Sequence, residues 1–184
     1  MENKIVFVHS AGPQTDTEGS TGILNKLTKT LHSTHTIVAP DMPNPEDPSY
    51  AEWAEDIGII LSDLDHVILI GHSLGGSALL KYLSEQRPKI NIRALYIISS
   101  PMWGLDEEWQ KADFMLEKGF EKSLPPIKHL ALYHSEYDSV VPLEHHFNYK
   151  EILNADETEI FEGDSHIFLN GLPDLVRSIQ ALKE

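Results

Sequence analysis

The sequence predicts an α/β protein with a doubly wound, mostly parallel six-stranded sheet and helices on both faces. Six short runs rich in Val, Ile and Leu alternate with longer stretches in which apolar residues recur at helical spacing. Several runs are almost continuously apolar, which is typical of strands buried on both faces of a parallel sheet. Right-handed crossovers place the carboxyl ends of such strands at one edge, where functional sites form. The predicted strands are 4–9, 35–40, 65–71, 92–100, 128–134 and 157–163.

The connections between these strands carry helical patterns. In "GILNKLTKTL" the apolar residues recur on one helical face, and Ser20 or Thr21 precedes them as a candidate cap. The proline-rich stretch 39–50 is predicted to form a loop. We expect the span 101–126 to hold about one helix, too little for a separate lid domain. The predicted helices are 19–32, 50–62, 74–86, 105–120, 143–153 and 172–183.

Composition and charge exclude several classes of function. The chain has 184 residues, 29 of them acidic and 14 basic, and a formal net charge of −15. We therefore expect one domain, residues 1–184, and no nucleic-acid binding through a basic face. The absence of cysteine excludes disulfides, thiolate metal sites and a cysteine nucleophile. The ten histidines lack metal-ligand spacing, and the adjacent pair His145 and His146 diverges on a helix, so we expect no metal and no cofactor.

The first residues, "MENKIVFVHSAG", contain too short an apolar run for a signal peptide. No later run reaches the roughly 18 residues of a membrane-spanning helix. We therefore expect a cytoplasmic protein that does not associate with membranes.

A single hydroxyl lies at a sharp turn in "VILIGHSLGGSALL", where Ser73 stands between Gly71 and Gly75. A G-x-S-x-G turn between a strand and a helix forces the serine into a strained conformation and requires small flanking residues. The pattern alone is weak, because a tight strand-to-helix turn can carry an incidental serine. Its position after an apolar strand and before a helical pattern favours a nucleophile.

Two further residues follow later strands in the order that a Ser-Asp-His triad requires. Asp138 lies in "SEYDSVVP", after the fifth predicted strand, and His166 lies in "DSHIF", after the last. Both positions are at carboxyl ends of strands, the same edge as Ser73. The sequence therefore predicts Ser73, Asp138 and His166 as catalytic residues.

Each of these positions has competitors. Glu136 shares the loop of Asp138, and Asp164 precedes His166 but is better explained by the shape of its turn. Asp41 is better explained as a cap of a turn in the proline-rich loop. His72 is adjacent to the nucleophile and cannot easily reach its hydroxyl, so packing explains it better. His134, at a strand end near Asp138, is the best alternative base.

Backbone amides are expected to bind the developing oxyanion. The N–H of Leu74, at the start of the helix, is one predicted donor. The second is expected from the loop "VHSAGP" after the first strand, with Ala11 preferred and Ser10 second.

The sequence resembles the α/β-hydrolase superfamily, and within it the small serine hydrolases related to retinoblastoma-binding protein 9 and YdeN. The resemblance rests on "VHSAG", "DMPNPEDPSYAEW", "GHSLGGSALLKYL", "SEYDSVVP" and "GDSHIF", which extend over almost the whole chain. It implies a minimal hydrolase fold without a large cap, with Ser73 as nucleophile, Asp138 as orienting acid and His166 as base. The chain has no cysteine and therefore lacks the L-x-C-x-E motif, so binding to retinoblastoma-type pocket proteins is not implied.

We therefore predict a serine hydrolase that cleaves small or medium carboxylic esters through an acyl-enzyme. The same triad would also serve an amide, a short peptide or a thioester, and a non-catalytic binding protein on a hydrolase scaffold is a third possibility. The expected partner is a small-molecule ester or amide. Residues expected near the substrate are Ser10, Met42, Met102, Trp103 and Phe168; for Met102 and Trp103, packing over the sheet edge is an equal alternative.

Overall fold

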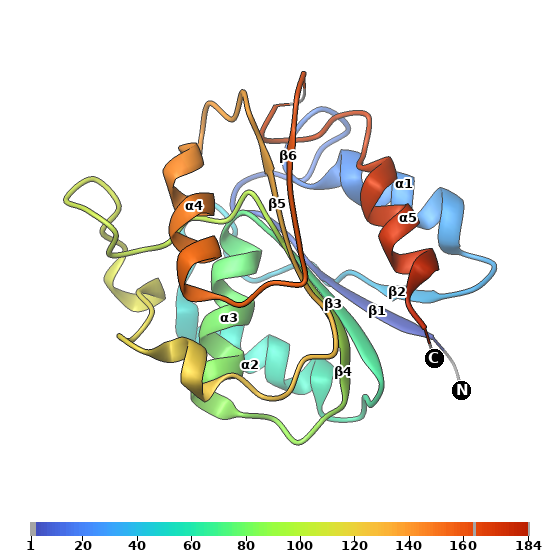
Figure 1. Ribbon diagram of the computed structural model, residues 1–184, viewed down its shortest axis with the longest axis horizontal. Coiled ribbons are helices and arrows are strands. Elements are labelled where there is room, and N and C mark those ends of the chain that lie inside the picture. Colours follow the sequence, from blue (N-terminus) through green and yellow to red (C-terminus); the bar gives the residue numbers. More distant parts are fainter. Residues whose placement is uncertain (1–2, 164, 184) are drawn as a thin grey trace.

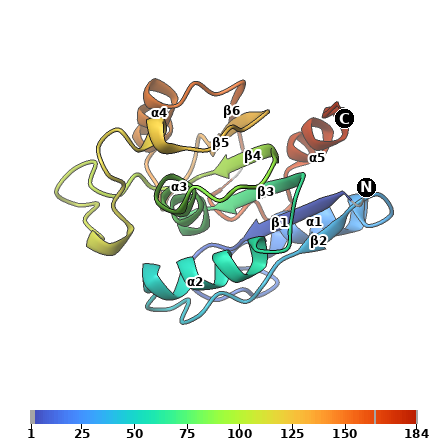
Figure 2. The ribbon, with the colours of Figure 1, turned by 90° about the horizontal axis from the view of Figure 1, so that it is seen from below.

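The computed structural model describes residues 3–163 and 165–183 and contains a six-stranded, entirely parallel sheet (Figure 1). Its strands are β1 (Lys4–Val8), β2 (Thr36–Val38), β3 (Val67–His72), β4 (Ile92–Ile98), β5 (Leu130–Ser135) and β6 (Glu157–Phe161). They lie in the order β2-β1-β3-β4-β5-β6, and Figure 2 shows them following one another from the bottom of the view to the top. The doubly wound parallel sheet is therefore confirmed.

Helices cover both faces of the sheet, because successive strand residues point to opposite sides. In β1, Ile5 and Phe7 enter one apolar cluster, whereas Val6 and Val8 enter the other. The first cluster is covered by α1 (Thr21–Leu31) and α5 (Pro173–Ala181), and the second by α2 (Tyr50–Leu61), α3 (Leu74–Gln86) and α4 (Leu143–Ile152) (Figure 1). These five helices begin and end within two residues of their predicted bounds.

The middle of the sheet is the position from which Ser73 emerges. Every residue of β3 is buried, and the strand pairs with β1 on one side and β4 on the other. At its carboxyl end Gly71 is opposite Val8, and His72 is opposite Ile98. The edge strand β6 is only partly covered. The chain therefore leaves β3 at the centre of the carboxyl edge, with strand ends on both sides.

The predicted helix over 105–120 is wrong. This stretch contains only short 3-10 turns, η1 (Ala112–Phe114) and the start of η2 (Phe120–Ser123). The Asp106 carboxylate accepts the backbone N–H groups of Glu108 and Trp109, an arrangement that competes with helix hydrogen bonds. Phe114 is fully buried against the rings of two α2 residues, which holds the segment flat on the molecule. The result is a compact structure without a large cap.

No helix within the described ranges, 3–163 and 165–183, is both long enough and apolar enough to cross a membrane.

Candidate active site

Ser73 occupies a strained turn between β3 and α3. Its backbone angles are φ 53° and ψ −124°, in a region that non-glycine residues avoid. Such a conformation costs about 1–3 kcal/mol and persists only where the surroundings enforce it. Here the Ser73 N–H donates to the Ile98 carbonyl at 2.8 Å, and the Ser73 carbonyl accepts the N–H of Gly76 at 3.0 Å. The turn that the G-x-S-x-G pattern predicts is therefore present.

The glycines around Ser73 are required by close backbone contacts. A Cβ atom on Gly71 would lie 2.5 Å from the Gly76 Cα, and one on Gly75 would overlap the Val8 carbonyl. Even an alanine at either position would displace the strand or the helix. The small flanking residues that the sequence predicts are therefore a steric requirement of this turn.

Asp138 and His166 form a hydrogen-bonded pair after the two last strands. The His166 Nδ1 donates to Asp138 Oδ2 at 2.8 Å, and Asp138 Oδ1 accepts the N–H groups of Val140 and Val141 at 2.9 and 2.8 Å. The Asp138 side chain is only 1% exposed. Burial by itself raises its pKa, but the hydrogen bond and charge of His166 and the two backbone donors outweigh burial and lower the pKa below its ordinary value. Asp138 is thus held as a carboxylate against the imidazole.

His72 connects this pair to the turn of Ser73. Its Nε2 donates to the His166 carbonyl at 2.8 Å, and the two rings lie 4.9 Å apart. Its Nδ1 lies 2.8 Å from the Ser20 hydroxyl, which must be the donor because Nε2 carries the proton. Burial, with a smaller contribution from the nearby His166, lowers the pKa of His72 to about 3, so the ring is neutral. His72 therefore packs, as the sequence suggests, and holds the His166 backbone through this hydrogen bond.

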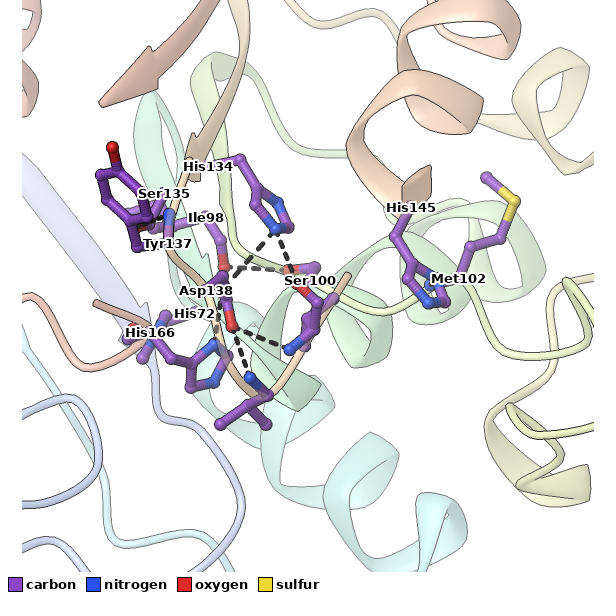
Figure 3. Close-up of polar contacts among 12 residues, drawn as sticks. His72, Ile98, Ser100, Met102, His134, Ser135, Tyr137, Asp138, His145 and His166 are labelled. Carbon is purple, nitrogen blue, oxygen red and sulfur yellow. Dashed lines mark hydrogen bonds and ion pairs between the residues drawn. The ribbon is translucent and has the colours of Figure 1, made fainter. Parts of the chain in front are cut away.

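His134, the alternative base, is directed away from this role. Its Nε2 donates to the Val141 carbonyl at 2.9 Å and lies 3.6 Å from Asp138 Oδ2 (Figure 3). In Figure 3 Asp138 lies between His134 and His166, and the three side chains form one polar cluster. The His134 side chain is 1% exposed. It therefore contacts the acid from the side opposite His166.

Two of the remaining competitors do not enter this cluster. Glu136 and Asp41 are exposed, and Asp164 lies outside the described residues. Among the parts of the chain that the structure describes, no group of three or more His, Asp or Glu side chains could hold a metal ion.

Ser73 opens into a hollow of about 270 Å³, which we call the Ser73 hollow. Ala11 and Leu74 line it together with Ser73. The Leu74 N–H belongs to the first turn of α3, whose amides have no partner within the helix. The N–H of Ser10 donates to the Ser20 hydroxyl at 2.8 Å, which leaves Ala11 as the better second donor. Both preferred oxyanion residues therefore border the same space as the Ser73 side chain.

Only one of the predicted side-chain contacts with substrate lines the Ser73 hollow. Trp103 does, but Met102 lines a neighbouring hollow, and Met42 and Ser10 line a third. The prediction for Phe168 is wrong, because the side chain is fully buried between the sheet and the layer of α1 and α5. A left-handed turn at Phe168, φ 44°, directs its ring against His72 rather than toward Ser73.

Most of the residues that line the Ser73 hollow are not predicted by the sequence. Trp109 and Lys111 lie in the stretch that was predicted to be helical, and Val140 and Val141 follow Asp138 in its loop. The other unpredicted lining residues are Glu46, Asp47, Pro48 and Pro101. For residues 46–48, the sequence feature that could have indicated the site is the proline-rich loop to which they belong. That loop reaches the site because the Gly12 N–H donates to the Pro45 carbonyl at 2.7 Å.

Comparisons with known proteins agree with this architecture. A sequence model of the alpha/beta hydrolase family matches residues 5–176. A comparison with curated proteins by sequence finds no match. Among solved structures, the ydeN gene product from B. subtilis superposes with a TM-score of 0.80 at 19% identity, over 98% of each chain.

Two larger hydrolases have the same fold. The 2-hydroxy-6-oxo-6-phenylhexa-2,4-dienoate hydrolase from Rhodococcus sp. strain RHA1 has a TM-score of 0.73 at 15% identity, over 97% of this chain and 89% of that one. A monoacylglycerol lipase from Paleococcus ferrophilus has a TM-score of 0.69 at 17% identity, over 96% and 91%. Since the family model matches most of the sequence and the fold agrees over nearly its whole length, the chain belongs to the alpha/beta hydrolase family.

Proposed function

We propose that this protein is a serine hydrolase that cleaves small or medium carboxylic esters, with Ser73 as nucleophile, His166 as base and Asp138 as orienting acid. Two observations support the proposal: the strained turn of Ser73 at the end of the central strand, and the buried Asp138–His166 pair, whose His166 carbonyl accepts a hydrogen bond from His72, the residue before Ser73. A positive φ at a serine, at the end of the central strand, has a cost that a merely structural turn could avoid with glycine. The hydrolase names of the structurally similar proteins support the same class of reaction.

The hydrogen bond from His166 to Asp138 suits a general base. Because Nδ1 donates to Asp138, a neutral ring leaves Nε2 free to accept a proton. In the proposed reaction Ser73 Oγ attacks the ester carbonyl carbon while Nε2 takes the hydroxyl proton. The carbonyl electron pair moves onto oxygen, where the Leu74 and Ala11 amides stabilise the negative charge.

Collapse of this intermediate breaks the bond to the leaving alcohol, which receives the proton from His166. The acyl group then remains on Ser73 Oγ. Water attacks it in the second half of the reaction, with His166 again taking a proton. The acid departs and Ser73 recovers its hydroxyl proton.

Labelling with a fluorophosphonate probe and hydrolysis of p-nitrophenyl acetate test the assignment. Wild-type protein should be labelled and active, and Ser73→Ala should lose both. Ser99→Ala is the matched control: Ser99 also has a positive φ, 43°, at the neighbouring strand end, and its buried hydroxyl has no hydrogen-bond partner among the described residues. It should keep both signals.

Retained labelling in Ser73→Ala would contradict the proposal. If wild-type protein is never labelled but captures a protein partner equally well as Ser73→Ala, a binding role on a hydrolase scaffold is favoured. Matched ester, amide and thioester substrates with one acyl group then decide which bond is cleaved fastest, and we expect the ester.

A further inference from the structure

Two hollows meet at Trp103. One is the Ser73 hollow, with a volume of about 270 Å³. The other, which we call the α4 hollow, has about 590 Å³ and is bounded by α4, η2 and the segment between Met102 and Lys122. Among the described residues, Trp103 alone lines both. Trp103 is therefore the residue at which the space next to Ser73 meets a space more than twice as large.

The Trp103 side chain is held by ring packing. Its ring lies 5.2 Å from that of Trp109, which in turn packs edge-on against His145 at 4.5 Å. The indole N–H is buried and has no hydrogen-bond partner in the described residues. A buried donor of this kind contributes no anchoring hydrogen bond. Removing the indole therefore breaks no hydrogen bond of its N–H among the described residues.

The backbone on both sides of Trp103 is anchored independently of that side chain. The Met102 N–H donates to His145 Nδ1 at 2.9 Å (Figure 3). The Gly104 N–H donates to the Trp109 carbonyl at 2.7 Å, and Gly104 has a φ of 89°, which suits glycine. A smaller residue at 103 should therefore leave the segment in place and widen the junction of the two hollows.

The α4 hollow has the chemical character that an alkyl chain needs. Its lining includes the apolar side chains of Leu105, Leu116, Phe120 and Ile152, and charged residues of η2 and α4 stand beside them. An acyl chain attached to Ser73 Oγ begins in the Ser73 hollow, whose walls include the apolar Leu74 and Val141. A chain that outgrows this space meets the α4 hollow at Trp103.

We propose that Trp103 sets the acyl-chain length, so that the protein selects esters of short acids and excludes long-chain acyl groups from the α4 hollow. This inference rests on the proposed serine hydrolase function. It assigns the α4 hollow as a latent alkyl-binding site that the indole closes.

A series of p-nitrophenyl esters with acetate, butyrate, octanoate and laurate tests the proposal, because only the acyl chain changes. Wild-type kcat/KM should be highest for acetate or butyrate and fall at least about tenfold for octanoate. In Trp103→Ala each methylene that becomes buried should raise kcat/KM about fourfold. The preference should therefore reverse: octanoate has four more methylenes than butyrate, and its kcat/KM should gain about 250-fold over wild type if all four become buried.

Two further variants separate the proposed role of Trp103 from general loosening. Leu116→Ala enlarges the α4 hollow alone and should keep the wild-type chain-length profile. Asn148 lies on α4, lines the α4 hollow and is partly exposed, so tryptophan should be tolerated there. The double variant Trp103→Ala/Asn148→Trp fills the α4 hollow and should restore the preference for short chains.

Binding of lauric acid, measured by calorimetry in Ser73→Ala and in Ser73→Ala/Trp103→Ala, provides a readout that needs no turnover. The double variant should bind at least about tenfold more tightly. Equal binding in the two proteins, or a Trp103→Ala enzyme that keeps the short-chain preference, overturns the proposal. Loss of hydrolysis in every protein with the tenfold difference in binding intact would instead refute the proposed serine hydrolase function alone.

Discussion

The contact between His134 and the loop of Asp138 leads to a quantitative prediction. His134 is buried, donates to the Val141 carbonyl at 2.9 Å and lies 3.6 Å from Asp138. The same loop provides the Val140 and Val141 N–H groups that hold Asp138 Oδ1. His134→Phe keeps an aromatic ring against His146, which packs at 5.7 Å, but removes the hydrogen bond from the His134 ring to the Val141 carbonyl.

The size of the effect follows from the cost of an unpaired buried carbonyl. Leaving such a group without a donor costs about 1–3 kcal/mol, and the free energy of unfolding of His134→Phe should fall by that amount. If the loop shift misplaces Asp138 against His166, a loss of the same size at the transition state lowers kcat/KM about 5- to 150-fold. His134→Gln places a donor near the position of Nε2 and should recover most of both losses, whereas the shorter His134→Asn should not.

We would measure kcat/KM on p-nitrophenyl acetate and the free energy of unfolding in urea for wild type, His134→Phe, His134→Gln and His134→Asn. Two results would refute the argument in different ways. A His134→Phe enzyme with wild-type kcat/KM and reduced stability would make His134 purely structural. A loss as complete as that of His166→Ala, unrecovered in His134→Gln, would make His134 the base itself.

Three further predictions concern the turn, the acid and the buried imidazole. Gly75→Ala should lower the free energy of unfolding by about 3 kcal/mol, measured by urea denaturation, because the new Cβ would overlap a backbone carbonyl. In the control Gly119→Ala the new Cβ would meet no atom within 4 Å, but φ is 84°, so the free energy of unfolding should fall by only about 1 kcal/mol. Asp138→Asn should keep the fold and lower kcat about 10³- to 10⁴-fold on p-nitrophenyl acetate, since the amide no longer favours the His166 tautomer with a proton on Nδ1. His72 should make the protein less stable in acid, because its pKa is 6.5 in the unfolded chain and about 3 in the folded protein. The contribution of His72 to the free energy of unfolding is therefore complete above pH 6.5 and is lost as the pH falls, by up to about 1.4 kcal/mol per pH unit. Urea midpoints between pH 7.5 and 5 measure this slope.

Each of these three has a result that contradicts it. Equal destabilisation in the two glycine variants would mean that the turn relaxes around the new Cβ atom at Gly75, so that the close contact has no large cost. Wild-type kcat in Asp138→Asn would remove the carboxylate from the proposed mechanism. A His72→Gln protein with the same acid slope as wild type would assign that slope to other groups.

Most of the architecture followed from local patterns. Continuous apolar runs predicted the strands because both faces of a parallel sheet are covered, as β3 shows. Placing Ser73, Asp138 and His166 after three different strands of a parallel sheet predicted that they would share one edge, and the Asp138–His166 hydrogen bond agrees with that expectation. Their catalytic roles remain a prediction for the variants above.

The predictions that failed depended on contacts between distant parts of the chain. The stretch 105–120 has a helical pattern, but an Asp106 turn and the burial of Phe114 against α2 replace the helix. Phe168 follows the predicted base closely in sequence and was therefore expected to line the substrate pocket. Its left-handed backbone conformation instead directs the ring into the core. Periodicity carries no information about which partner competes for a side chain, so neither outcome was visible in the sequence.

The sequence by itself determined the sheet, its layers and the edge at which the chemistry gathers, because strand polarity and crossover handedness leave one arrangement for such a pattern. The tertiary structure decided which surfaces face Ser73. Trp103 lies where two hollows meet, and His134 contacts the acid from behind, because loops far apart in sequence pack together there. Those contacts depend on side-chain positions across strands and loops, which no local pattern encodes.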